Sequence, residues 1–194
     1  PIDRVFAMRG FGTVVTGTLV GAKLATGAAV EVQPSGRRAR IRGLQSHGEE
    51  TAEITPGSRC AVNLQGLEVA DLRRGDVLCE PDSLAPTTSA DLRLVWLATA
   101  PACEDPVSVE LLVGTAERRA TLAAIGDSGF LPGGRHFARV HIEGDPLPLL
   151  PGDRFIARGF ARSETAGATL GGGVVIDVAP PHRRRSDPAL VREL

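Results

Sequence analysis

The sequence contains no tyrosine, and its 194 residues include only one tryptophan, one methionine and six phenylalanines. It also lacks any apolar run of the roughly 20 residues that a transmembrane helix needs. We therefore expect no membrane-spanning helix and no membrane partner. No secretory signal peptide is visible. Residue 1 is proline rather than methionine, so we expect the chain to be a piece of a longer protein.

Cysteine is scarce as well. The three cysteines, Cys60, Cys79 and Cys103, are odd in number and widely spaced. No CxxC pair or Cys/His cluster occurs, which argues against a zinc site and against a disulfide framework. The sequence thus predicts no metal site, and unpaired cysteines favour a reducing compartment, for which the cytoplasm is the default.

Phosphate-binding motifs are absent too. The Walker pattern GxxxxGK[ST] occurs nowhere, and the glycines of "RGFGTVVTGTLV" (residues 9–20) precede strand-forming residues rather than the helix that a dinucleotide fingerprint requires. Gly17 instead lies inside a predicted strand, where glycine often marks a bulge or a close backbone approach. With no catalytic motif either, we expect no cofactor in this chain and no enzymatic activity from it alone.

Charge excludes one further class of protein. The formal net charge is −1, so the molecule as a whole is not a polycation, and only local basic stretches could contact nucleic acid.

The sequence does contain a regular series of short β-prone runs. Its 23 glycines and 14 prolines alternate with aliphatic segments, in a chain that is 42% hydrophobic, which indicates tight turns rather than disorder. Six such runs precede the segment "PDSLAPTTS" and six follow it. Short strands at even spacing, with no helical period, predict an all-β fold of two closed antiparallel barrels.

The same pattern predicts the domain organisation. We expect a first barrel at residues 1–82, a linker at 83–89 and a second barrel at 90–181. The last residues, 182–194, form a basic tail whose Asp187–Pro188 pair is typical of a helix start, so a further helical domain is expected to begin there.

Several motifs carry a resemblance to a known family. The run "IDRVFAMRGFGTVVTGTLVGAKLATGAAVEV", followed by "PGSRCAVNLQG" and "LRRGDVLCEP", resembles the second domain of translational GTPases of the elongation factor Tu superfamily. With "RIRGLQSHG", "GTAE" and "LPGDRFIARGF…GGGVVID", nearly the whole chain is similar to the selenocysteine-specific elongation factors, the SelB family. The resemblance implies the second and third domains of such a factor, both of them β-barrels.

What the family does supplies further expectations. The resemblance implies a GTPase domain, with its GTP and Mg²⁺, before Pro1, and RNA-binding domains after the basic tail. Its implied partners are selenocysteyl-tRNA, the ribosome and, through the C-terminal domains, the mRNA hairpin that directs selenocysteine insertion. Two alternatives remain open: the equivalent domains of another translational GTPase, or a β-barrel binding module unrelated to translation.

The resemblance also implies an aminoacyl pocket in the first barrel. Asp3 and Arg4 match an acidic pair of the general factor, and Arg59 matches an amide position, so two of these positions are arginine here. A selenol is more acidic than a thiol, whose pKa is about 8.5, and guanidinium groups that stay charged complement a selenolate. Adjacent strand residues point to opposite faces, so Asp3 and Arg4 share a pocket only if the strand begins irregularly. The alternative is that both arginines are solvated surface residues.

The remaining candidates concern the tRNA itself. From the superfamily pattern, the terminal adenosine is expected near Met8, Val14, Gln45, His47 and Asn63; the alternatives are a core position for Val14 and an exposed loop position for His47. "RRARIR" is predicted to place arginines on one strand face, either against RNA phosphates or simply in solvent. The resemblance adds phosphate candidates in the second barrel. These basic candidates are Arg38, Arg40, Arg42, Arg118, Arg119, Arg158 and Arg162.

Overall fold

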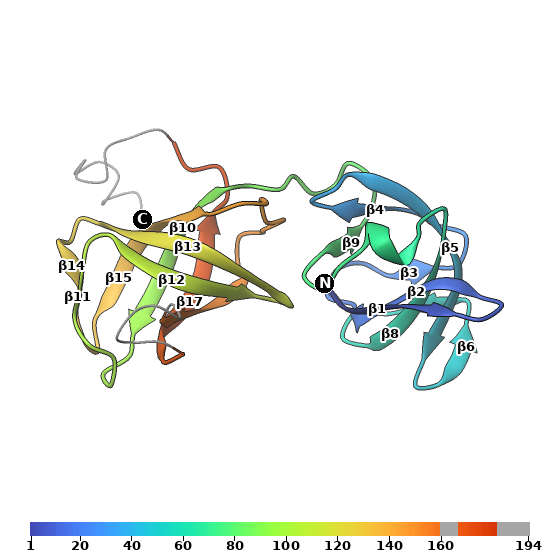
Figure 1. Ribbon diagram of the computed structural model, residues 1–194, viewed down its shortest axis with the longest axis horizontal. Helices are drawn as coiled ribbons and strands as arrows, with labels where there is room; N and C mark the ends of the chain where they lie inside the picture. Colours follow the sequence, from blue (N-terminus) through green and yellow to red (C-terminus); the bar gives the residue numbers. More distant parts are fainter. Residues whose placement is uncertain (160–166, 182–194) are drawn as a thin grey trace. The chain divides into compact units, whose positions relative to one another are not determined.

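The structure, a computed structural model, describes residues 1–159 and 167–181. The chain divides into two compact units, Pro1–Ala85 and Pro86–Leu194, and both are built from strands (Figure 1). This all-β architecture confirms the predicted fold class. The division lies within the predicted linker, and a bridge between Thr87 and Leu147 assigns the later part of that linker to the second unit. The expected basic tail lies outside the described residues.

The first unit contains all six predicted strands together with very short ones that no sequence period indicated. A strand of two or three residues is too short to show an alternation. The elements are β1 (Ile2–Met8), β2 (Gly12–Thr18), β3 (Leu24–Ala25), β4 (Ala29–Gln33), β5 (Arg37–Ser46), β6 (Glu49–Thr51), β7 (Glu53–Ile54), β8 (Arg59–Gln65), the 3-10 turn η1 (Val69–Asp71) and β9 (Val77–Cys79).

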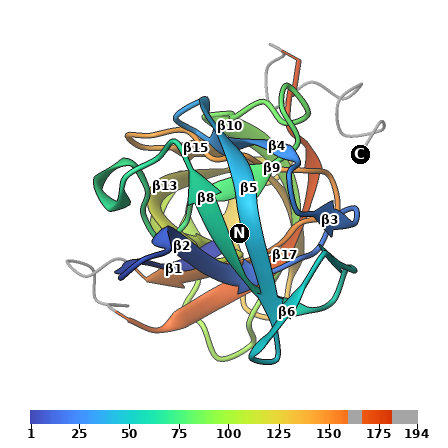
Figure 2. The same ribbon diagram turned by 90° about the vertical axis from the view of Figure 1, so that its right-hand side faces the viewer.

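The main sheet of the first unit is antiparallel and runs in the order β1-β2-β8-β5-β4-β9, with β6 beside β5 (Figure 2). Its two ends meet at Ile2, whose N–H donates to the Asp76 carbonyl (2.8 Å) and whose carbonyl accepts from Gly75 N–H (3.0 Å). The predicted barrel is therefore closed by two hydrogen bonds at one end of β1. Beyond Ile2, β1 pairs with β2 only.

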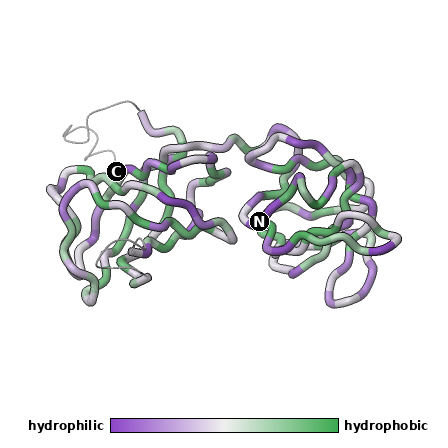
Figure 3. Tube along the Cα trace, in the orientation of Figure 1, coloured by the Kyte–Doolittle hydropathy of each residue, from purple (hydrophilic) through white to green (hydrophobic). Residues whose placement is uncertain are grey.

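Hydrophobic and hydrophilic residues are interspersed along these strands (Figure 3), and the buried hydrophobic ones form one cluster. The buried cluster includes Val15, Val30, Ile41 and Val62, each at most 3% exposed. Burying one aliphatic side chain of this size contributes roughly 1.5–3 kcal/mol. Because successive residues of a strand point to opposite faces, the neighbours of these residues lie on the outer face of the barrel.

Gly17 confirms the close approach expected from the sequence. It pairs with Ile2, and a Cβ at this position would overlap the carbonyl oxygen of Pro1. On the facing strand the register shifts between Ile2 and Arg4. Asp3 is therefore the extra residue of a β-bulge, so β1 begins irregularly.

The second unit is a closed antiparallel barrel in the order β10-β15-β13-β12-β16-β17, with the pair β11-β14 beside it. Among its described residues, all six strands predicted from the sequence are present. The strands are β10 (Ser89–Trp96), β11 (Cys103–Glu104), β12 (Val107–Val113), β13 (Ala116–Ile125), β14 (Gly129–Phe130), β15 (Arg135–Ile142), β16 (Arg154–Gly159) and β17 (Thr169–Asp177).

Aliphatic side chains and a stacked aromatic pair fill the described part of the second barrel. Trp96 is fully buried, stacks on Phe130 with ring centroids 5.0 Å apart, and donates from Nε1 to the Pro101 carbonyl (2.8 Å). The glycine run "GGG" lies within β17 and not in a ligand loop, and a Cβ at Gly172 would lie 2.7 Å from the Phe155 carbonyl oxygen. The glycines thus allow neighbouring strands to approach closely.

Candidate functional site

The bulge at Asp3 brings the candidate aminoacyl residues onto one face of the first barrel. Arg4 pairs with Thr16 across β1 and β2, and Thr16 pairs with Ala61 on β8, two residues from Arg59. The side chains of Thr16 and Arg59 both reach Asp3. Since the extra residue shifts Asp3 out of the regular alternation, Asp3 and Arg4 share the outer face, which is the irregular start that the pocket hypothesis required.

Asp3 is the centre of this arrangement. Arg59 Nη1 lies 2.6 Å from Asp3 Oδ2, and Thr16 Oγ1 donates to Asp3 Oδ1 at 2.7 Å. Burial by itself would raise the pKa of Asp3. The hydrogen bonds from Arg59 and Thr16, with the positive charges of Arg59 and Arg4, outweigh burial and lower this pKa. Asp3 is therefore a carboxylate at neutral pH that orients the Arg59 guanidinium.

Solvent reaches both arginines of the group. The Arg59 side chain is 58% exposed, whereas that of Asp3 is 17% exposed, and Arg4 is exposed as well. Both guanidiniums are therefore hydrated in the free chain. The two guanidiniums would lose water only when a ligand covers them, because no other part of the described first unit does so.

A pocket of about 480 Å³ opens on the same face. Val14 and Ala61 line the pocket. Val14 pairs with Asn63, and Ala61 pairs with Thr16, whose side chain bonds to Asp3. Four of the five residues predicted for the terminal adenosine line this pocket: Met8, Val14, Gln45 and Asn63. They come from β1, β2, β5 and β8, so the strand register alone brings them together. Val14 is 6% exposed and so counts among the buried hydrophobic residues, as its core alternative expected, although it lies outside the main buried cluster of the barrel.

His47 is the predicted adenosine residue that the structure separates from this pocket. It lies in the turn between β5 and β6 with φ 54°, is exposed, and does not line the cavity. The reason is local: His47 and Gly48 both have positive φ and form the tight turn of a hairpin, which directs the chain away from the sheet face. His47 therefore lies at an exposed turn, apart from the other four candidates.

The polarity of the pocket is uneven. Apolar side chains, including Phe11, form part of the wall, while Arg42 and Glu50 add charges. Asn63 is 8% exposed, and its Oδ1 has no hydrogen-bond partner among the described residues. An unsatisfied buried acceptor costs about 1–3 kcal/mol. The arrangement suits a flat, largely apolar ligand with polar groups at its edges.

Sequence reasoning missed Phe11, Arg42 and Thr16 as parts of this face. Phe11 was counted only as part of a turn, and Arg42 only as part of a phosphate stripe. Thr16 carried a usable signal, because it alternates with Val15 in "TVVTGT" and so had to point outward if Val15 points inward.

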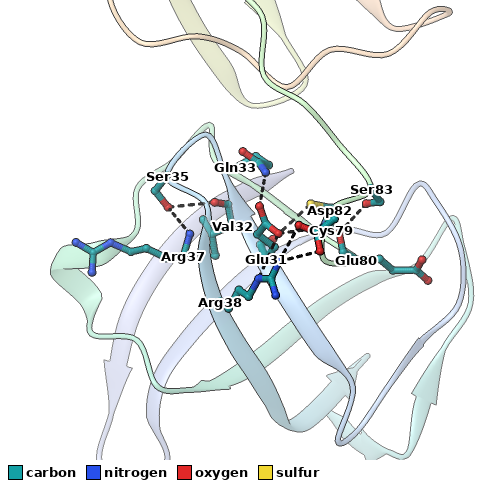
Figure 4. Close-up of polar contacts among 10 residues, drawn as sticks. All are labelled: Glu31, Val32, Gln33, Ser35, Arg37, Arg38, Cys79, Glu80, Asp82 and Ser83. Carbon is teal, nitrogen blue, oxygen red and sulfur yellow. Dashed lines mark hydrogen bonds and ion pairs between the residues drawn. The ribbon is translucent and has the colours of Figure 1, made fainter.

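The three arginines of β5 that were predicted to share one strand face differ in their contacts. Arg38 Nη2 binds both oxygens of Asp82 (2.7 and 2.8 Å), and its Nε lies 3.7 Å from Glu31 (Figure 4). Arg40 donates to the Gly27 carbonyl (3.0 Å). The register shifts between Ile41 and Gly43, so Arg42 occupies a bulge and lines the pocket.

Figure 4 shows the carboxylates that surround the Arg38 guanidinium. Glu31 is a buried residue whose carboxylate accepts from Gln33 Nε2 (2.6 Å) and from the Asp82 N–H (3.0 Å). Arg38 offsets one of the two negative charges of Glu31 and Asp82. A guanidinium occupied in this way is a poor candidate for a phosphate contact, because binding RNA would compete with its internal partners.

The basic candidates of the second barrel are also partly occupied. Arg158 Nε donates to Glu110 (2.8 Å) and its Nη2 donates to Glu117 (2.7 Å), so two carboxylates neutralise it. Arg119 pairs with Glu110 across β12 and β13. Arg118 donates to the Glu117 carbonyl (3.0 Å). Arg162 lies outside the described residues. Among the described members of this set, Arg158 is therefore the one shown against carboxylates, whereas the bond of Arg118 goes to a neutral backbone carbonyl.

Within residues 1–159 and 167–181, no group of three His, Cys, Asp or Glu side chains is arranged to hold a metal ion. No helix in this part of the chain is long and apolar enough to cross a membrane.

Comparison with known proteins agrees with this architecture. The family model described as elongation factor Tu domain 2 matches residues 12–79, which include β2, β5 and β8. A selenocysteine-specific elongation factor of Desulfomicrobium baculatum is 38% identical over 96% of the chain, which spans 29% of that relative. Elongation factor 1-alpha of Saccharolobus solfataricus is 27% identical over 93% of the chain, which spans 45% of it.

The chain thus spans less than half the length of these curated relatives. The match to the selenocysteine-specific factor extends through both units, with higher identity than the match to elongation factor 1-alpha. The two β-barrels, the domain match and this similarity together show that the chain belongs to the elongation factor Tu superfamily, in its selenocysteine-specific (SelB) branch.

Proposed function

We propose that this chain is the tRNA-binding part of a selenocysteine-specific elongation factor that delivers selenocysteyl-tRNA to the ribosome. The outer face of the first barrel binds the aminoacylated 3′ end. The pocket lined by Met8, Val14, Gln45 and Asn63 takes the terminal adenosine, and Asp3, Arg4 and Arg59 take the esterified amino acid. GTP and Mg²⁺ belong to a separate nucleotide domain of the factor, which works in the cytoplasm, and other domains bind the selenocysteine-insertion hairpin of the mRNA.

The observation that carries the proposal is the Asp3–Arg59 ion pair next to the pocket. Its 2.6 Å contact orients one guanidinium, and Arg4 lies on the same face. The net charge of Asp3, Arg4 and Arg59 is +1, so the group has capacity for one further negative charge. A selenolate supplies that charge, whereas the neutral hydroxyl of serine does not.

The selectivity follows from desolvation. When the tRNA end covers the site, both arginines lose water, and an unpaired buried charge costs several kcal/mol. A difference of 1.4 kcal/mol is already tenfold in affinity. Size offers less, since a pocket separates ligands that differ by one small group by only about 10- to 200-fold.

The test replaces each arginine with the residue type of the general factor, R4E and R59N, in the chain joined to its nucleotide domain. Affinity for selenocysteyl-, cysteyl- and seryl-tRNA is compared at one fixed salt concentration, because phosphate contacts make affinity depend on salt. Both variants are expected to lower the preference for selenocysteyl-tRNA over seryl-tRNA by at least tenfold.

Arg74 provides the matched control, because it is an exposed arginine of the same barrel outside the group. R74N should leave the preference unchanged. If R4E and R59N bind all three tRNAs as the parent does, the arginines do not read the amino acid. A chain that ignores the esterified residue would instead be the equivalent part of a general factor such as elongation factor 1-alpha.

A further inference from the structure

The chain leaves the first barrel through a short turn that is fastened to the outside of β4. Residues Glu80–Ser83, which we call the strap, directly follow β9. Ser83 closes the turn, because its N–H (3.3 Å) and its Oγ (2.7 Å) both donate to the Glu80 carbonyl. The strap is therefore a hydrogen-bonded turn rather than an extended piece of linker (Figure 4).

Glu31 anchors the backbone of the strap. Val30 and Val32 belong to the core, so Glu31, which lies between them on β4, points outward, yet it is only 7% exposed. Its carboxylate accepts a hydrogen bond from the Asp82 N–H at 3.0 Å. A hydrogen bond to a carboxylate is stronger than one to a neutral acceptor. The strap is thus bound directly to a buried acidic residue of the barrel.

Asp82 has a backbone conformation that its surroundings must maintain. Its φ is 58°, in the left-handed region that residues other than glycine rarely adopt. Such a residue persists where neighbouring contacts fix it. Arg38 Nη2 binds both carboxylate oxygens of Asp82 (2.7 and 2.8 Å), and Arg38 Nε lies 3.7 Å from Glu31. The backbone and the side chain of Asp82 are therefore held by two different residues of the barrel.

The second unit holds the chain again after only three intervening residues. Thr87 exchanges two backbone hydrogen bonds with Leu147 (2.8 and 2.9 Å). Between the strap and Thr87, Leu84 and Ala85 form no backbone hydrogen bond with any part of the chain that the structure describes. Pro86 has a fixed φ and restricts Ala85 to extended conformations. Backbone rotation is therefore concentrated at Leu84 and, to a smaller extent, at Ala85.

We propose that the strap is a conformational device that confines the movement between the two units to a hinge at Leu84 and Ala85. Glu31 and Arg38 hold the strap to the first barrel and so remove its four residues from the flexible connection. A shorter and stiffer connection reduces the conformational entropy that is lost when one ligand contacts both units. The hinge has this effect whatever ligand the two barrels bind.

NMR relaxation of the backbone amides in the isotope-labelled chain tests the proposal, because it measures an order parameter for each N–H. Asp82 and Ser83 should have values close to those of a rigid strand, about 0.85, whereas Leu84 and Ala85 should lie below about 0.6. R38Q should lower the values of Asp82 and Ser83 towards that of Leu84. It should also reduce the protection of the Asp82 amide against solvent exchange about two- to fivefold, as expected for the loss of an exposed ion pair.

A second variant and a matched control isolate the ion pair. Asparagine also tolerates a positive φ, so D82N removes the charge, keeps the backbone conformation and should also lower the protection. If R38Q and D82N act through the same contact, the double variant should show less than the product of the two single effects. R37Q is the control, because Arg37 forms an ion pair from the same strand with Asp71 (2.7 Å), outside the strap.

Three results would contradict the proposal. In the first, Asp82 and Ser83 are as mobile as Leu84 in the parent chain, so the strap is not held. In the second, R38Q and R37Q have equal effects on the strap, or neither has one, so the Arg38 contact does not fasten it. In the third, R38Q lowers the order of β4 as much as that of the strap, so Arg38 stabilises the barrel instead. The replaced side chains are all more than half exposed, so the variants should fold.

Discussion

The carboxylate of Asp3 and the guanidinium of Arg59 meet at 2.6 Å, although 55 positions separate them in the sequence and they lie on non-adjacent strands. The contact depends on the bulge that places Asp3 on the outer face of β1. This ion pair joins two of the candidate aminoacyl residues directly, and its chemistry can be tested without any ligand.

The first prediction concerns the pH dependence of stability. The pKa of Asp3 is lowered from 3.8 in the folded chain, by hydrogen bonds and charges that exceed the effect of burial. A lowered folded-state pKa adds stability above the unfolded value, and this stability is lost as the pH falls through the folded value. D3N should therefore be less stable than the parent chain by about 1 kcal/mol at neutral pH, and the difference should shrink as the pH falls below 3.8 towards the lower folded-state pKa of Asp3.

Urea unfolding monitored by circular dichroism at pH 7, 5, 4 and 3 measures this difference. The comparison with D3N isolates Asp3 from the other carboxylates, which titrate in both proteins. A difference of the same size at pH 7 and pH 3 would show that the charge of Asp3 is not what stabilises the site.

The second prediction concerns a buried ion pair in the second barrel. Arg139 binds Asp91 through Nε (2.7 Å) and Nη2 (2.9 Å), with side chains 9% and 1% exposed. The hydrogen bond to Asp91 raises the pKa of Arg139 further. Removing one partner leaves a buried charge, which typically costs about 3–5 kcal/mol. D91N should therefore destabilise the second unit by several kcal/mol.

Trp96 reports on this unit alone, because it is the sole tryptophan and lies buried in the second barrel. Its fluorescence during denaturation gives the unfolding free energy. E117Q is the control within the same unit: it removes the contact between Arg158 and Glu117, whose side chains are 33% and 54% exposed, and should change stability by at most about 1 kcal/mol. Equal effects of D91N and E117Q would contradict the prediction.

The third prediction concerns Gly17. A Cβ there would overlap the Pro1 carbonyl, which belongs to the backbone and cannot rotate away. G17A should therefore destabilise the first unit by about 1–3 kcal/mol, as overpacking of a well-packed site does. Thermal unfolding followed by circular dichroism measures the change. G21A is the matched control, because a Cβ at Gly21 has no atom within 4 Å; if G21A is as destabilising as G17A, close packing is not the cause.

Local pattern was sufficient to predict the strands. In "TVVTGT", one valine points inward and its neighbours outward, and every predicted strand of both units is found among the described residues. The same pattern could not indicate β3 or β11, because two residues carry no period. Nor could it show that the first barrel closes through hydrogen bonds of Ile2 rather than through a full strand ladder.

Site residues could be predicted where the pairing register of neighbouring strands brings them together. Val14, Asn63 and Gln45 lie on neighbouring strands in one outer-face patch, and the resemblance placed them together. His47 was misplaced because the positive φ of a hairpin turn is a property of a few residues and overrides the strand pattern. Arg38 was a candidate for a phosphate contact because the sequence does not reveal its ion-pair partner, Asp82. Asp82 is 44 positions away, directly before the predicted linker.

The sequence by itself determined the all-β class, the two-barrel organisation and the identity of the arginines, because alternation and composition are local properties of the chain. Tertiary structure decided which of those arginines are available. Arg38 and Arg158 form ion pairs with carboxylates that are distant in the sequence, whereas a one-residue bulge places Asp3 beside Arg59 and Arg4. Such distinctions depend on the positions of charges that are distant in the chain and close in space, and an ion pair exists only when folding brings both members to the same place.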